Sequence, residues 1–225
     1  MTIIRKFLFG CGVLLCLNAV ATADTSPVPM LEQSANQILS TLKTNKSALK
    51  TQPQIVYQAV ERHLLPHVDV RGMARSVLGR EAWQKASDAE KTAFMQAFTR
   101  LVIRTYASPL SEYNQETIQF YPIKTAVNER FVRAKSLIVR PHGKNIPLSY
   151  SLVAINGDWK IYDFSVEGVS LLQSFRSQFA DALHKSTIQA VTQQLNQQQL
   201  KKQTAQRSPL KSLLKMQQIS EKKVA

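Results

Sequence analysis

The sequence predicts an α+β fold in which N-terminal helices and a C-terminal helix pack on one face of a four-stranded antiparallel meander sheet. Three observations predict it. Apolar residues recur every three or four positions through most of residues 28–106, as on one face of an amphipathic helix. From about residue 117 to residue 166 they alternate with polar residues in segments separated by short turns, as in half-buried strands. Helical spacing then returns after residue 170, which favours a sheet covered on a single side.

Residues 1–23 have the features of an export signal rather than of a structural element. Arg5 and Lys6 precede a nearly continuous apolar run at 7–20, and Ala21-Thr22-Ala23 is the small-x-small pattern after which signal peptidase cleaves. The run is shorter than the ~20 residues that a membrane span needs. We therefore expect cleavage after Ala23 and a mature chain outside the cytoplasm.

Both cysteines, Cys11 and Cys16, lie within this signal. Disulfides, thiol catalysis and cysteine metal sites are therefore excluded for the cleaved form. A lipoprotein is an alternative, because Leu8-Phe9-Gly10-Cys11 loosely resembles a lipid-attachment box, although Phe9 fits that box poorly. The 202 residues after position 23 (225 minus 23) suffice for one domain, which we place at 24–195, followed by a Gln- and Lys-rich basic tail at 196–225 that is expected to be partly disordered.

Four helices are expected before the first strand. Pro53 is tolerated at the first helical position and opens the second of them, and Gly79 ends the third. Ser87 and Glu90 form a capping box at the start of the fourth, since each side chain can accept the other's backbone amide. The four predicted spans are residues 28–45, 53–64, 68–78 and 88–108.

The four strands are expected at about residues 117–121, 131–139, 146–155 and 159–166. Pro141-His142-Gly143 forms the turn of the middle hairpin, with glycine at the position that requires positive φ. Counting outward from this turn gives four inward-facing pairs: Ile138 with Ile146, Ser136 with Leu148, Ala134 with Tyr150, and Val132 with Leu152. The opposite, mostly polar face then carries Arg133, Lys135, Ser149 and Ser151.

The facing of the last strand is left open by the sequence. Asn156-Gly157 is a two-residue turn signal, which would direct Trp159 and Ile161 inward. A β-bulge or a loop of odd length would instead direct inward the aromatic and β-branched residues Tyr162, Phe164 and Val166. After this strand we expect a sharp corner at Glu167-Gly168 and a helix capped by Ser170.

Ala134 and Ser136 are small residues at inward positions of the predicted sheet. Opposite the large side chains Phe94, Phe98 and Tyr106 of the fourth helix, they leave space in the interior unless another side chain fills it. Ordinary interdigitation of large against small residues explains the same pattern. The residues alone therefore leave a pocket and a filled core both open.

Three motifs occur in order along the chain. They are Leu64-Leu65-Pro66-His67-Val68-Asp69-Val70 with the later Val77-Leu78-Gly79, the helix from Ala89 to Tyr106, and the corner Trp159-x-x-Tyr162-Asp163-x-x-x-Glu167-Gly168-Val169-Ser170. Over roughly residues 28–195 the sequence thereby resembles MlaC-type proteins, the toluene-tolerance auxiliary family. The resemblance implies helices wrapped on an antiparallel sheet, related to the nuclear transport factor 2 fold, around an apolar pocket for acyl chains.

The resemblance also implies a function. Such a protein is a phospholipid carrier in the periplasm of Gram-negative bacteria. It moves lipid between an outer-membrane lipoprotein–porin complex and an inner-membrane ABC transporter with a lipid-binding docking subunit, and so maintains outer-membrane lipid asymmetry. Phospholipid would be cargo, and no cofactor is expected. The residues expected to contact lipid are Phe94, Phe98, Leu101, Val102, Tyr106, Val132, Tyr150, Leu152, Phe164, Val166 and Val169.

The chain lacks the patterns that would favour an enzyme. His63 and His67 have the spacing of a helical metal pair, but Pro66 between them ends the helix and no glutamate follows His63. Asp163 and Glu167 could be an acid/base pair. We favour structural roles, in which Glu167 accepts amides at the start of the helix and Asp163 pairs with a lysine or arginine.

The chain is strongly basic, with a formal net charge of +14 that falls to +12 when Arg5 and Lys6 are removed. For an exported protein this charge suits anionic lipid headgroups or acidic surface polymers. An alternative function is therefore a module that binds a membrane or a partner through its basic surface and tail, without lipid transfer. No nucleic-acid partner is expected, because the basic residues are spread without an aromatic-interleaved patch.

Overall fold

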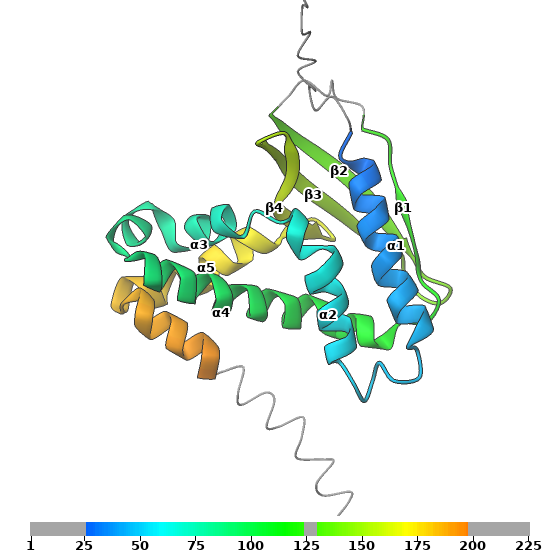
Figure 1. Ribbon diagram of the computed structural model, residues 1–225, viewed down its shortest axis with the longest axis horizontal. Helices are drawn as coiled ribbons and strands as arrows, with labels where there is room; N and C mark the ends of the chain where they lie inside the picture. The colour runs from blue at the N-terminus through cyan, green and yellow to red at the C-terminus, as the bar shows by residue number, and fades with distance from the viewer. Residues whose placement is uncertain (1–25, 124–129, 198–225) are drawn as a thin grey trace, which may run out of the picture.

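The computed structural model describes residues 26–123 and 130–197 (Figure 1). The predicted signal and nearly all of the predicted tail lie outside these residues. None of the helices in the described ranges has both the length and the apolar content of a membrane span. In chain order the elements are α1 (Val28–Thr44), α2 (Gln54–His63), η1 (Leu65–His67), α3 (Val70–Lys85), α4 (Asp88–Ala107), η2 (Ser108–Glu112), β1 (Thr117–Phe120), β2 (Phe131–Val139), β3 (Ile146–Ile155), β4 (Asp158–Val166), β5 (Val169–Ser170), α5 (Leu171–Lys185) and a last helical stretch at residues 188–197.

The α+β class with an open antiparallel meander is confirmed, but the sheet has five strands rather than four, in the order β1-β2-β3-β4-β5. The extra strand arises at Glu167-Gly168. Both residues have positive φ, 51° and 85°, which is the backbone of a two-residue hairpin turn. The chain therefore reverses and pairs Val169 with Val166 and Ser170 with Ser165 before α5 begins, instead of turning a corner directly into the helix.

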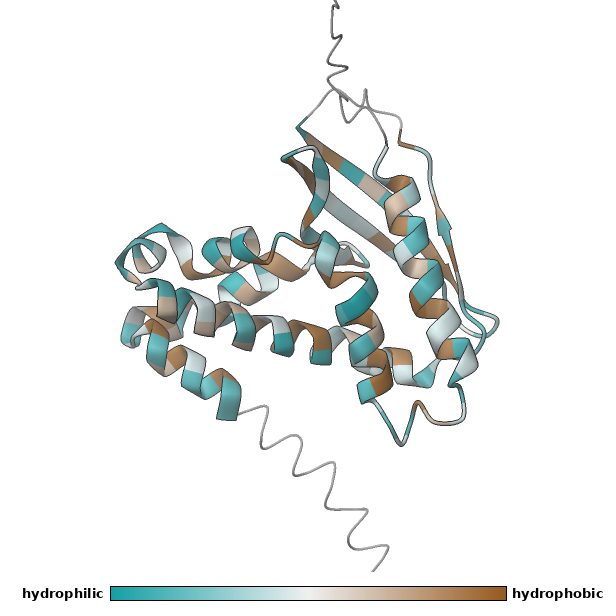
Figure 2. Cartoon of the chain, viewed as in Figure 1, coloured by the Kyte–Doolittle hydropathy of each residue, from teal (hydrophilic) through white to brown (hydrophobic). Residues whose placement is uncertain are grey.

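The middle hairpin has the predicted register. Val132 pairs with Leu152, Ala134 with Tyr150, Ser136 with Leu148 and Ile138 with Ile146. Side chains at the first three of these pairs are buried, whereas Arg133 and Lys135 between them are exposed. Figure 2 shows the resulting alternation of hydrophobic and hydrophilic residues along the strands. One face of the sheet is thus apolar and covered, and the other faces solvent.

Both facings of the last strand occur in part, because β4 contains a β-bulge, but Tyr162, which the second alternative directed inward, instead contacts the exposed Phe131 ring. After the Asn156-Gly157 turn, Ala154 pairs with Trp159 and Leu152 with Ile161, so that Trp159 and Ile161 are buried. The register then shifts between Ser151 and Leu152, where Tyr162 is the extra residue, and pairing resumes at Ser151 with Asp163. The bulge changes the phase of the strand, so its second half also directs apolar residues inward, namely Phe164 and Val166.

The helix boundaries follow the predicted caps with one correction. The Ser87–Glu90 capping box is confirmed in both directions, with a 3.2 Å bond from the Glu90 amide to Ser87 Oγ and a 2.9 Å bond from the Ser87 amide to Glu90 Oε2. Gly79 does interrupt the third helix, at φ 77° and ψ 165°. The helical conformation resumes directly after it, however, and α3 continues to Lys85, a turn that the sequence prediction omitted.

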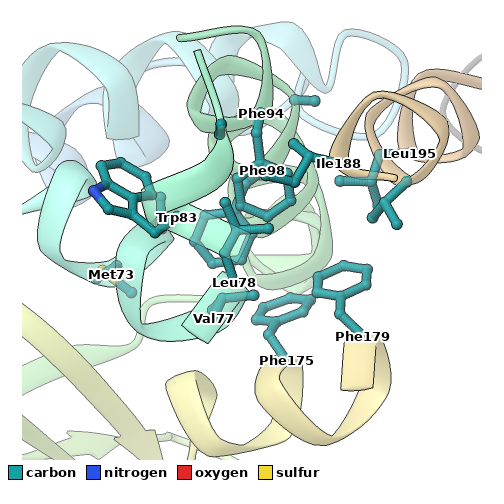
Figure 3. Packing of buried hydrophobic residues seen from close by; sticks show 14 of the residues in the cluster. Met73, Val77, Leu78, Trp83, Phe94, Phe98, Phe175, Phe179, Ile188 and Leu195 are labelled. Atoms are coloured by element: carbon teal, nitrogen blue, oxygen red, sulfur yellow. The ribbon is translucent and has the colours of Figure 1, made fainter. Parts of the chain in front are cut away.

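The interior divides into three groups of apolar side chains. The sheet cluster lies between the inner sheet face and α1 and comprises Leu31, Val132, Ala134, Leu148, Tyr150, Leu152, Trp159 and Ile161. The helical cluster joins α3, α4, α5 and residues 188–197, and includes Met73, Val77, Leu78, Trp83, Phe94, Phe98, Leu171, Phe175, Phe179, Ile188, Val191 and Leu195 (Figure 3). A third group links α1, α2 and the end of α4 through Ile38, Leu42, Leu49, Val56, Ala59, Ile103 and Ala107. In Figure 1, α1 crosses the sheet while α3, α4 and α5 extend away from it.

Candidate functional site

The inner face of the sheet carries a row of three aromatic rings from three strands. The Tyr150 ring of β3 lies in the middle, 5.8 Å from the Phe120 ring of β1 and 5.2 Å from the Phe164 ring of β4, measured between centroids. Tyr150 is buried, whereas Phe120 and Phe164 remain partly exposed. This row provides an apolar wall whose two ends are still accessible.

The polar atoms on this wall pair with each other. The Tyr150 hydroxyl lies 3.1 Å from Ser136 Oγ, and both residues are buried. Burial raises the pKa of the Tyr150 phenol to about 12, although the hydrogen bond with Ser136 acts in the opposite direction. The phenol is therefore neutral at physiological pH, and the apolar wall carries no charge at this point.

The two larger clusters meet at Phe164 and Val68. Both are partly buried side chains that pack against the sheet cluster and against the helical cluster. From the α4 side, Leu101, Val102 and Tyr106 pack on the helical cluster and also remain partly exposed. Burial, with a smaller contribution from the Asp163 charge, raises the pKa of the Tyr106 phenol. Phe164 of β4 and Val68 of the η1–α3 connection thus join the two clusters, and partly exposed apolar side chains of α4 pack on the helical one.

The eleven residues predicted to contact lipid are divided among these environments. The sheet cluster and the residues packed on it hold Val132, Tyr150, Leu152, Phe164 and Val166. Leu101, Val102 and Tyr106 lie at the edge of the helical cluster. Phe94 and Phe98 lie inside that cluster with their rings stacked 5.8 Å apart, and Val169 is 64% exposed. Five of the predicted residues thus belong to the sheet cluster or pack on it, three pack on the helical cluster with part of their surface exposed, and the other three are two buried phenylalanines and one exposed valine.

Three residues that pack on the sheet cluster were missed by the sequence reasoning. Phe120 pairs with Ser136 across β1 and β2, so the alternation of β1 together with the hairpin register could have placed it inward. Leu64 packs on both the sheet cluster and the third group, and Val68 forms a bridge to Ile161. These two lie in a motif that was noted only as a resemblance, and their contacts depend on how η1 meets β4.

The corner between β4 and α5 is held by hydrogen bonds to Asp163. Its carboxylate accepts from the Ser170 hydroxyl at 2.7 Å, from the Leu172 amide at 3.0 Å and from the Phe164 amide at 2.8 Å. Glu167 instead faces Lys144 in an exposed ion pair of 3.7 Å. Both acids have structural contacts, but their predicted roles are exchanged: Asp163 accepts an amide at the helix start and Glu167 pairs with a lysine.

The described residues contain no group of three or more histidine, cysteine or acidic side chains that could hold a metal ion. His63 ends α2 and His67 lies in η1, so no common helix carries the predicted pair. Burial lowers the pKa of His67, and the nearby Lys160 charge lowers it further. His67 therefore stays neutral near pH 7.

Comparisons with known proteins agree on one family. The family model described as MlaC protein matches residues 32–197. A toluene tolerance protein of Pseudomonas putida is 30% identical over 178 residues, which are 78% of this chain and 82% of that protein. The intermembrane phospholipid transport system binding protein MlaC of Haemophilus influenzae is 28% identical over 181 residues, 79% of this chain and 84% of that protein.

A solved structure supports the fold. It is the phospholipid-binding protein of Ralstonia solanacearum in complex with a phospholipid, with a TM-score of 0.70 and 24% sequence identity. The match covers 77% of this chain and 96% of that one. At this identity the likeness shows that the two chains share a fold. Since the family model spans well over half of the sequence and a relative reaches 30% identity along most of its length, the chain belongs to the MlaC protein family.

Proposed function

We propose that this protein is a periplasmic phospholipid carrier that holds acyl chains at the junction of the sheet cluster and the helical cluster. The observation that carries the proposal is the apolar inner sheet face, whose polar side chains Ser136 and Tyr150 are hydrogen-bonded to each other while Phe120 and Phe164 remain partly exposed. Relatives named for phospholipid binding and intermembrane phospholipid transport support it.

The proposed pocket has walls from both clusters. Val132, Tyr150, Leu152, Phe164 and Val166 would contact lipid from the sheet, together with Phe120. Leu101, Val102 and Tyr106 would contact it from α4, and Val68 from the start of α3. Phe94 and Phe98 would instead support this wall from inside the helical cluster, and Val169 would stay in solvent.

An apolar pocket is sufficient for carriage. Two acyl chains contain about 30 methylenes, and moving them from water to an apolar medium is worth ~0.8 kcal/mol each, or ~24 kcal/mol in all. Free lipid therefore does not cross an aqueous gap at a useful rate. A protein that returns most of this free energy makes transfer from bilayer to pocket nearly neutral, and no group has to perform chemistry.

The same proposal includes a route. The carrier would exchange lipid with an outer-membrane lipoprotein–porin complex and with an inner-membrane ABC transporter through its lipid-binding docking subunit. Such exchange would maintain outer-membrane lipid asymmetry. Nearly neutral transfer suits this role, because small differences in affinity between the two partners can then set the direction.

Native mass spectrometry of the protein purified from periplasm without detergent tests the proposal. We expect a stoichiometric adduct with the mass of a phospholipid, on a chain that begins at Asp24. A protein that is free of lipid and also fails to extract labelled phospholipid from vesicles would contradict the carrier function. A chain of full length would contradict cleavage after Ala23.

Two valines that pair across the last hairpin provide a matched control. Val166 packs on the sheet cluster, and its partner Val169 is 64% exposed. Val166→Asp would place a charge against the acyl chains and should reduce the lipid adduct severalfold, because an unpaired charge is costly in an apolar site. Val169→Asp should leave the adduct unchanged. Equal adducts in the two variants would show that the inner sheet face is not the pocket wall.

A second candidate function rests on the formal net charge of +14. In it, the protein binds a membrane or a partner through its basic surface and tail without transferring lipid. It predicts vesicle binding that weakens with salt and is lost when residues 200–225 are deleted, with no extraction of labelled lipid. Extraction of lipid that survives this deletion would exclude it in favour of the carrier.

A further inference from the structure

A basic depression of about 450 Å³ lies on the surface between α3 and α5. It is lined by three arginines, with polar and aromatic side chains between them: Arg75, Arg80, Arg176, Ser76, Trp83 and Gln84. The first two arginines come from α3 and the third from α5. None of these residues belongs to the walls proposed for the acyl-chain pocket, so this depression is a separate feature of the molecule.

The break at Gly79 builds this depression. Positions 71 and 83 would lie about 18 Å apart in a straight helix that rises ~1.5 Å per residue. The Arg71 guanidinium nevertheless lies 5.2 Å from the centre of the Trp83 ring, because the chain changes direction at Gly79, which also lines the depression. The arginines before and after the break thereby share one concave surface.

The depression has an excess of positive charge. Arg75, Arg80 and Arg176 are exposed, and none of them forms an ion pair within the described part of the chain. Among the residues that the structure describes, no carboxylate lines the depression. Lys91 lies beside it, with its ammonium 5.6 Å from the centre of the Trp83 ring, but it pairs with the Asp88 carboxylate at 3.3 Å and so adds no unpaired charge. Like charges that converge without a counter-charge repel one another, and a bound anion would relieve that repulsion.

We propose that this depression binds the phosphate of an anionic phospholipid headgroup at a bilayer surface. Guanidinium groups match phosphate oxygens with paired hydrogen bonds, and the Ser76 hydroxyl and Gln84 amide add donors to the same surface. Its volume falls within the range of pockets for a single small ligand. An acidic peptide would need an extended groove for several carboxylates, whereas the arginines here line one compact depression.

The site would dock the protein on the membrane from which it takes lipid, or to which it delivers lipid. The docking site does not rest on the proposed acyl-chain pocket, since the two share no residue. A variant that lacks the arginines should therefore lose membrane binding while it still carries its lipid adduct. Failure of the carrier function and failure of the docking site are thus distinguishable.

The test measures binding of the mature chain to phosphatidylcholine vesicles with and without phosphatidylglycerol. The variant R75Q/R80Q/R176Q should bind the anionic vesicles about tenfold less tightly or worse, because each basic residue near an anionic surface contributes substantially to binding. The matched control is K43Q/R62Q/R133Q, which removes the same charge from exposed positions on α1, α2 and β2. It should bind within about twofold of the parent protein.

A second variant, R75K/R80K/R176K, keeps the charge. Its affinity for anionic vesicles should lie between those of the parent protein and R75Q/R80Q/R176Q, because lysine lacks the paired donors.

Competition by inorganic phosphate shows whether the ligand of the depression is a lipid headgroup or a soluble phosphate. We expect it to compete with anionic vesicles for the parent protein more strongly than chloride does at equal ionic strength, and to have no such additional effect on R75Q/R80Q/R176Q. Equal loss of binding in the two glutamine variants would overturn the proposal, since diffuse charge would then suffice. Binding of phosphate at the arginines without any binding of vesicles would also overturn it, because the ligand would then be a soluble phosphate. Circular dichroism melting confirms that each variant is folded.

Discussion

The Ser170 hydroxyl donates a hydrogen bond of 2.7 Å to the Asp163 carboxylate and at the same time accepts one of 3.1 Å from the Gln173 amide. The same carboxylate accepts the Leu172 amide at 3.0 Å. Two amides of the first turn of α5 are therefore satisfied, one by Ser170 and one by a residue of β4. The end of the sheet and the start of the helix form one hydrogen-bonded unit.

Removing the Asp163 carboxylate should destabilise this unit. We expect Asp163→Ala to lower the free energy of unfolding by about 1.5–3 kcal/mol, because hydrogen bonds to a charged group are lost and a helix amide is left without its acceptor. Asp163→Asn retains one acceptor oxygen and should lower it by about half as much. Glu167→Gln is the control and should change it by less than about 0.5 kcal/mol, because Glu167 makes only an exposed ion pair. Urea denaturation measures all three, and equal stability of Asp163→Ala and the parent would refute the structural role.

Gly79 should resist substitution for conformational reasons. It has φ 77° and ψ 165°, a region essentially reserved for glycine. A Cβ added there would meet no atom within 4 Å, so any cost comes from the backbone rather than from a clash. We expect Gly79→Ala to lower the free energy of unfolding by about 1–3 kcal/mol.

The neighbouring exposed residue Gln84 supplies the control for that measurement. Gln84→Ala lies in the helical turn after the break and should change the stability by less than about 0.5 kcal/mol. Thermal denaturation compares the two variants. A Gly79→Ala protein as stable as Gln84→Ala would show that the chain relaxes to a straight helix without cost.

The sequence predicts the middle hairpin well because two local signals agree there. Gly143 has the positive φ that its turn position requires, 96°, and the alternation of β2 and β3 allows only one facing once a register is chosen. The capping box of Ser87 and Glu90 is similarly local, since both partners lie within one turn. Such features depend on few residues and could be predicted correctly.

The parts that could not be predicted depend on contacts between distant segments. Phe94 and Phe98 were expected opposite Ala134 and Ser136, since large and small residues often face each other. They instead meet Phe179 and Phe175 of α5, with centroid separations of 6.4 and 5.2 Å. Periodicity identifies which face of a helix is apolar, but it does not specify which of two apolar partners that face will meet. The division of the predicted site between two clusters has this origin.

The β-bulge at Tyr162 allows the effect of the extra residue in β4 to be measured separately from the effect of the tyrosine side chain. Deleting Tyr162 would remove the extra residue and restore a regular ladder, in which Asp163 still pairs with Ser151 and Phe164 with Tyr150, so that Phe164 and Val166 would keep facing inward. We expect this deletion to keep the fold and to lower the free energy of unfolding by about 1–3 kcal/mol, because the local twist of the bulge and the contact of Tyr162 with Phe131 are lost while the inward residues are kept.

Substitution of the same residue provides the comparison. Tyr162 contacts Phe131, which is 54% exposed on the outer sheet face, through rings 5.9 Å apart. Tyr162→Ala should therefore lower the free energy of unfolding by only about 1 kcal/mol. Differential scanning calorimetry compares the stability of the deletion variant with that of Tyr162→Ala. A deletion variant that fails to fold, while Tyr162→Ala folds, would contradict the preserved register and show that the two halves of β4 need the extra residue.

The hydroxyl pair of Tyr150 and Ser136 should make stability fall at high pH. The pKa of the Tyr150 phenol is about 12 in the folded protein, against an ordinary value of 10.0. A raised folded pKa means that the unfolded state releases its proton first, so the stabilisation is complete below pH 10 and is lost as the pH rises toward 12. We expect the free energy of unfolding to fall over this window by up to about 1.4 kcal/mol per pH unit from this group. Tyr150→Phe cannot ionise and should remove that part of the slope.

The Tyr150→Phe variant should also lose about 1 kcal/mol of unfolding free energy at pH 7, because the Ser136 hydroxyl is left without its partner. Tyr150→Phe/Ser136→Ala should recover part of that loss, because neither hydroxyl then remains buried. Urea denaturation between pH 7 and pH 12 gives both quantities, and parallel curves for the parent and Tyr150→Phe would show that the phenol is not held neutral by burial.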